Sequence, residues 1–245
     1  MRSDRPRRAR TAQEPVRRWG ARRAAWIAAA ALLGALGTAR ADPTDISRAE
    51  TLLFMTPHLK DLQPPSRLHY AFRKGGTLEA GFSDTVDLDI TGQPDGSKRG
   101  TARFFSGQHQ IDYPEVEHVE GNPVLMFYLE REIREMSRLT GGRADHFRQM
   151  IRLALAESAQ IKDIQIKVGG QTRLAQQVTI SPYTSDPNRA HFESLAAKQY
   201  KFTICDTIPG AVYELRGVVP AASGSPKDQA VIEETLTFVS AGVPK

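Results

Sequence analysis

The chain has 245 residues, and its 33 lysines and arginines against 28 acidic residues give a formal net charge of +5. Residues 1–41 hold ten of the arginines and only two acids, so residues 42–245 carry 23 basic against 26 acidic residues, a net charge of −3. Nucleic-acid binding depends on a basic surface that neutralises phosphates. The charge balance of residues 42–245 therefore removes the main support for a nucleic-acid partner, and we expect none.

The N-terminal segment is typical of an export signal. A basic stretch precedes an apolar run, Ala24 to Leu36, and the small residues Ala39 and Ala41 then flank Arg40. This is the order found in secretory signal peptides. The run of about 13 residues spans about 20 Å, short of the roughly 30 Å hydrocarbon core of a bilayer. We therefore predict cleavage after Ala41, a periplasmic location, no retained membrane span, and a single domain over 42–245.

In the first part of that domain, the sequence predicts a short helix followed by a group of strands. Apolar residues in 42–62 favour the helix, with Asp45 as a weak candidate for its start, and Pro64-Pro65 then leads into extended chain. Alternation of apolar and polar residues follows, which is typical of antiparallel strands with one dry and one wet face. The predicted strands cover 68–72, 85–90, 101–105 and 108–113.

A helical hairpin is predicted in the middle of the chain, between two groups of strands. Asn122 and Pro123 favour a helix start, and Gly141-Gly142 favours its end. Asp145 is a candidate cap for a second helix. The first helix carries an apolar stripe at spacings of three and four, which predicts that it lies across one face of the sheet. The stripe consists of Met126, Leu129, Ile133 and Met136.

The strand pattern returns after the hairpin and completes an α+β fold. Asp186-Pro187 predicts a short helix to about Ala197. We expect eight or nine strands in all, forming a curved antiparallel sheet covered on one side by the hairpin. This arrangement resembles the half-barrel of periplasmic carriers of lipoproteins and lipids in architecture, although no sequence motif accompanies the resemblance. The later strands are predicted over 164–168, 174–180, 200–205, 211–219 and 234–239.

The sequence offers little support for catalysis. The nucleophile motif G-x-S-x-G and the zinc-protease motif H-E-x-x-H are both absent from the chain. His109 and His118 lie in an acidic segment and are weak candidates for metal ligands, but their spacing matches no compact metal motif. We therefore expect no metal, no cofactor and no catalytic residue. A hydrolase with a dispersed site is the least favoured alternative.

The leading hypothesis is a non-catalytic periplasmic protein that binds an apolar ligand, such as a lipid or lipoprotein, or an envelope partner. A structural or interaction protein with a filled core is the alternative. On the second helix of the hairpin, Arg148 and Arg152 are candidates for a patch that binds anionic headgroups or an acidic partner. The residues predicted to line an apolar cavity are Tyr70, Phe72, Val86, Leu88, Met126, Phe127, Met136, Met150, Phe202, Tyr213 and Leu215.

Overall fold

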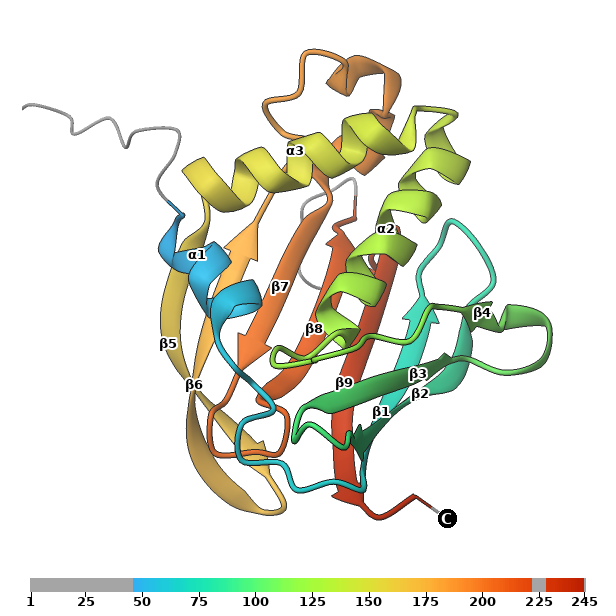
Figure 1. The fold of residues 1–245 in the computed structure, drawn as a ribbon. Coiled ribbons are helices and arrows are strands. Elements are labelled where there is room, and N and C mark those ends of the chain that lie inside the picture. The colour runs from blue at the N-terminus through green and yellow to red at the C-terminus, as the bar shows by residue number, and fades with distance from the viewer. Residues whose placement is uncertain (1–45, 222–227, 245) are drawn as a thin grey trace, which may run out of the picture. The chain divides into compact units, whose positions relative to one another are not determined.

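A nine-stranded antiparallel sheet forms the framework of the computed structural model, which describes residues 46–221 and 228–244 (Figure 1). The predicted signal peptide and its cleavage site lie outside these residues. The strand order is β4-β3-β2-β1-β9-β8-β7-β6-β5, so β9 joins the two sequential groups by pairing with β1 and β8. The strands are β1 (Ser66–Gly75), β2 (Phe82–Gly92), β3 (Lys98–Phe104), β4 (Ile111–Asp112), β5 (Gln160–Val168), β6 (Gln171–Ile180), β7 (Gln199–Ile204), β8 (Val212–Val219) and β9 (Ile232–Gly242).

The alternating sequence of the strands places apolar residues on the inner face of the sheet. In β1, Leu68, Tyr70 and Phe72 are at most 1% exposed. The intervening residues lie on the outer face, where His69 Nδ1 lies 2.6 Å from an Asp87 carboxylate oxygen on the neighbouring strand. Cross-strand pairs of this kind stabilise the polar face, while burial of the opposite face supplies most of the driving force.

The inner face is covered by two helices, α2 (Val124–Thr140) and α3 (Ala144–Glu157), which meet at Gly141. Gly141 adopts a left-handed backbone with φ of 70°, which a glycine tolerates at the end of a helix. The N-terminal turns α1 (Arg48–Glu50) and η1 (Thr51–Met55) lie beside α3 (Figure 1). None of the helices in the described part of the chain is both long and apolar enough to span a membrane.

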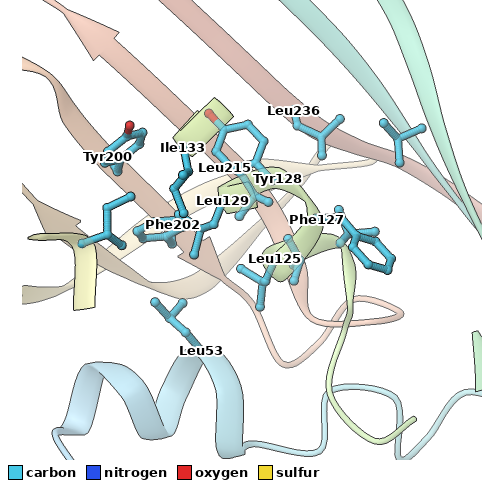
Figure 2. Packing of buried hydrophobic residues seen from close by; sticks show 14 of the residues in the cluster. Leu53, Leu125, Phe127, Tyr128, Leu129, Ile133, Tyr200, Phe202, Leu215 and Leu236 are labelled. Atoms are coloured by element: carbon cyan, nitrogen blue, oxygen red, sulfur yellow. The ribbon is translucent and has the colours of Figure 1, made fainter. Parts of the chain in front are cut away.

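The core lies between these helices and the sheet. Figure 2 shows Leu125, Leu129 and Ile133 of α2 directed toward Phe202 and Leu215 of the sheet. These side chains and those of β1 and β2 belong to one continuous buried cluster. The predicted α+β fold, with a curved antiparallel sheet and a helical hairpin on one side, is confirmed.

Three local predictions were wrong. The expected strand 108–113 is reduced to β4, because Phe105 and Gly107, at φ of 65° and 53°, turn the chain out of extended conformation. The second hairpin helix is not capped by Asp145, which lies in its first turn. The segment 186–197 forms two short 3₁₀ turns instead of a helix. Glu193 has a φ of 49° and interrupts them.

Asn122 fixes the start of α2 to the sheet. Its buried amide donates 2.9 Å hydrogen bonds to the Tyr70 hydroxyl and to the Gly210 carbonyl, and its side-chain oxygen accepts from the Val124 amide at 3.2 Å. Replacing it leaves two buried groups without this donor. Buried groups that lose a partner in this way carry a desolvation cost.

We expect Asn122→Ala to lower the free energy of unfolding by about 2–4 kcal/mol, since it removes two buried bonds and a cap. Urea titration followed by circular dichroism measures the change. Asn188→Ala, at an exposed loop position, is the matched control and is expected to change stability by less than about 0.5 kcal/mol. Equal effects of the two substitutions would contradict this role of Asn122.

Candidate functional site

Most of the residues predicted to line a cavity lie in the continuous core between the helices and the sheet. Met150 is half-buried and packs against that core, whereas Tyr213 belongs to a separate cluster around β5 and β6. Met126 differs from all of them, because it is 57% exposed. The fully or nearly fully buried members are Tyr70, Phe72, Val86, Leu88, Phe127, Met136, Phe202 and Leu215.

A charged cluster that the sequence analysis did not anticipate occupies the space between α2 and the sheet. Glu132 of α2, Glu234 of β9 and Lys198, which directly precedes β7, have fully buried side chains. Lys198 Nζ lies 2.6 Å from Glu132 Oε2 and 3.8 Å from Glu234 Oε2. The three residues therefore connect α2 with β9 and with the start of β7.

Arg131 completes this cluster from the next position of α2. Its guanidinium donates two 3.1 Å hydrogen bonds to the two carboxylate oxygens of Glu234 and a 2.6 Å bond to Glu132. It also lies 4.8 Å from the centre of the Phe72 ring. Bidentate pairing of this kind fixes geometry as well as charge. The cluster is continued outward by Lys74, which contacts Glu135 of α2 and lies 3.5 Å from Glu234.

The two buried glutamates have opposite pKa shifts. Burial, together with the negative charge of Glu234, raises the pKa of Glu132 to about 8. Burial also acts to raise the pKa of Glu234, but the hydrogen bond from Glu132 and the charges of Lys198 and Arg131 outweigh it. The pKa of Glu234 is therefore held well below its usual range. Glu132 is thus the member of the pair that retains a proton near neutral pH.

Gly217 of β8 allows the charged cluster to approach the sheet backbone. A Cβ atom at this position would lie 3.0 Å from Glu132 Oε2, 3.3 Å from the Tyr128 hydroxyl and 3.4 Å from Lys198 Cε. All four residues are buried, so these groups have little room to move aside. The glycine is required here by close approach of side chains, since its own backbone conformation is an ordinary one.

The sequence contained a signal for this cluster. Glu234 lies between Ile232 and Leu236, both buried, so it occupies an inward position of an alternating strand. Lys198 has the same parity as Tyr200 and Phe202 on the inner face. A charged residue at an inward position predicts a buried partner of opposite charge. The identity of that partner depends on the docking of α2, which the local pattern does not specify.

An apolar groove lies between the two hairpin helices and η1. It has a volume of about 260 Å³ and is lined from α2 by Met126, Leu129 and Ile133. The opposite wall is formed by Ile151 and Leu155 of α3, and Phe54 of η1 closes the third side. The predicted stripe of α2 therefore serves two environments, because Met136 is fully buried while Met126, Leu129 and Ile133 reach the groove.

Charged side chains surround this groove. Arg148 of α3 lies 3.0 Å from Glu130 of α2 and 2.5 Å from Asp145, so its charge is paired. Glu50 is engaged with Ser47 in the capping box of α1. Arg152 lines the groove and is exposed, and it makes no side-chain hydrogen bond or ion pair within residues 46–221 and 228–244. The two arginines of the predicted patch thus line the same groove, but only Arg152 has a guanidinium group without an ion-pair partner among the described residues.

The two histidines considered as metal ligands lie far apart in the structure. His109 stacks on Phe82 at the start of β2, with 4.0 Å between the ring centres. His118 is exposed and lies 3.7 Å from Asp95, in the turn that follows β2. They are thus separated by about the length of an eleven-residue strand. The described part of the chain contains no group of three or more potential ligands placed to hold a metal ion.

We expect Lys198→Met to lower the free energy of unfolding by about 3–5 kcal/mol, because it removes the buried cation beside Glu132 and Glu234 and leaves the two carboxyl groups to share Arg131. Chemical denaturation measures the loss. Adding Glu132→Gln is expected to recover part of it, since one carboxyl group is then removed. Arg216→Met is the control at a partly exposed ion pair with Glu233 and is expected to cost less than about 1 kcal/mol. If Lys198→Met and Arg216→Met lower the free energy of unfolding by similar amounts, the buried pairing of Lys198 is contradicted.

The raised pKa of Glu132 also predicts a pH dependence of stability. The folded state binds a proton more tightly than the unfolded state, so this contribution is complete below pH 4.5 and is lost as pH rises through about 8. Between these values, the stability of the wild type relative to Glu132→Gln is expected to fall by up to about 1.4 kcal/mol per pH unit. Chemical denaturation at a series of pH values measures this difference. If the free energies of unfolding of the wild type and of Glu132→Gln change with pH in the same way, the raised pKa of Glu132 is contradicted.

No family model and no curated protein matches the chain. Solved structures with some likeness include MucB, with 15% identity, a TM-score of 0.33, and 77% of this chain and 57% of that chain covered. The chain therefore spans little more than half the length of MucB, which has also been solved in complex with MucA(peri).

Two further structures with some likeness are those of a lipoprotein and of a member of a named superfamily. Mycobacterium tuberculosis lipoprotein LppX has 10% identity and a TM-score of 0.32, with 73% of this chain and 87% of that chain covered. A LolA superfamily protein from Nitrosomonas europaea has 10% identity and a TM-score of 0.24, with 80% and 94% covered. Likenesses at this level assign neither a family nor a function to the chain.

Proposed function

We propose that this chain is an exported, non-catalytic binding protein of the periplasm, and that it receives an apolar group of an envelope component in the groove between α2 and α3. The observation that carries this proposal is the exposed apolar surface of that groove. Met126 is 57% exposed although it lies beside Leu129 and Ile133, which are at most 5% exposed. A preformed depression lined mainly by apolar side chains is a typical site for an apolar ligand.

The groove suits this role better than the space beneath the helices. That inner space holds Tyr128, Phe202 and Leu215 at 0% exposure, together with the buried Glu132 and Lys198. A ligand placed there would have to displace paired charges as well as packed aromatic rings. The cost of separating buried charges is several kcal/mol for each ion. The groove, in contrast, requires no rearrangement of the core.

The function is tested by placing a photoreactive residue in the groove of the full-length chain in its native envelope. Met126→p-benzoyl-phenylalanine is expected to give a discrete crosslinked product under ultraviolet light, identified by mass spectrometry as protein or lipid. Leu174→p-benzoyl-phenylalanine, at a position of β6 that is 74% exposed, is the matched control. The same products at both positions, or none at Met126, would refute the proposal.

A further inference from the structure

We infer that the occupant of the groove is an amphipathic α-helix of a protein partner, which inserts apolar side chains between α2 and α3 and directs an acidic side chain to Arg152. This inference rests on the proposed use of the groove and specifies the chemistry of the partner. Three features of the site support it: the hydrogen-bonding state of its walls, its size, and the charges around it.

The walls of the groove are helical, and this restricts the backbone of a peptide ligand. The N–H and C=O groups within α2 and α3 are occupied by hydrogen bonds inside each helix. They cannot pair with an extended peptide as the edge of a sheet does. A peptide that enters an apolar groove must satisfy its own backbone groups, because burying them unpaired is costly. An α-helix meets this requirement over its whole length.

The size of the groove fits a few side chains of such a helix. Met126 and Ile133 are seven residues apart on α2, as Arg148 and Leu155 are on α3, so each wall extends over about two helical turns, or about 10 Å. Apolar side chains at positions i, i+3 or i+4, and i+7 of a ligand helix span the same distance. The volume of about 260 Å³ is below the range of about 300–1,000 Å³ typical of sites that enclose a small molecule. The groove therefore favours anchoring side chains over an enclosed acyl chain.

The charged residues around the groove determine which charge a partner helix should carry next to its apolar side chains. Arg148 is neutralised by Glu130 and Asp145, and Glu50 is engaged in its capping box. Arg152 thus presents an unpaired cation to a ligand, as far as the described residues show. An acidic residue beside the apolar stripe of the partner would complete this pair. Complementary charges at the rim of an interface chiefly determine partner choice.

Selection from a displayed library of amphipathic helical peptides tests the inference with purified protein. Peptides of about 16 residues, about 24 Å long as helices, extend beyond both ends of the groove. We expect the wild type to enrich apolar residues at helical spacing with an acidic residue next to them. The Arg152→Glu variant is expected to enrich a basic residue at that position. Arg189→Glu, an exposed position outside the groove, serves as the control and should leave the enriched sequences unchanged.

Individual selected peptides provide the quantitative measurement by fluorescence anisotropy. A peptide with the acidic residue is expected to bind Arg152→Glu about three- to ten-fold more weakly than wild type, and the corresponding lysine peptide should regain most of this loss. Met126→Asp should weaken both peptides. Enriched sequences without helical spacing, no enrichment, or an unchanged acidic preference on Arg152→Glu would overturn the inference.

A lipid occupant gives a different pattern of results. Binding of dodecanoate that is lost in Met126→Asp, combined with no peptide enrichment, would overturn the helix in favour of an acyl chain. A lipid product in the crosslinking experiment at Met126 would do the same while leaving the proposed function intact. If no crosslinked product forms at Met126, the proposed function itself is refuted. The two proposals can therefore fail separately.

Discussion

The buried pairing of Glu132, Glu234, Lys198 and Arg131 is the constraint on which the arrangement of α2 depends. Apolar packing alone permits a helix to rotate or slide on a sheet at modest cost, whereas a buried charge must keep its partner. Lys198 Nζ and Glu132 Oε2 lie 2.6 Å apart at full burial, so a shift of α2 by one residue would leave both side chains buried without their partner. The pairing therefore specifies one position of α2 more strongly than it adds to stability.

The same constraint determines where the candidate site lies. Arg131 and Glu132 direct one side of α2 to the sheet, which leaves Met126 directed to the exterior and Leu129 and Ile133 as the floor of the groove. The contact of Arg148 with Glu130 joins α3 to α2 at one side of this floor. The groove and the buried pairing thus lie on adjoining parts of the surface of one helix.

Much of the fold was predictable because its signals are local. Alternation in β1 and β2 and the cap and glycine residues around α2 act within a few positions, and they gave the correct sheet and hairpin. The candidate site was only partly predictable. The stripe from Met126 to Met136 indicated a buried helix face, but the division of that stripe between core and groove depends on the angle between α2 and α3. That angle arises from contacts between residues distant in sequence, which a local pattern does not contain.

The burial of Glu234 and Lys198 was not predicted, for a related reason. The same reason applies when other half-barrel folds are predicted from sequence. An apolar inner face is expected when the fold is thought to enclose a lipid, and Glu234 and Lys198 were accordingly not among the residues predicted to face inward. Their inward parity indicates the opposite. Once they are placed inside, the space beneath α2 has paired charges where a carrier would need free apolar volume. The proposed binding site is therefore the outer groove between α2 and α3, where a partner would bind without separating Lys198 from Glu132.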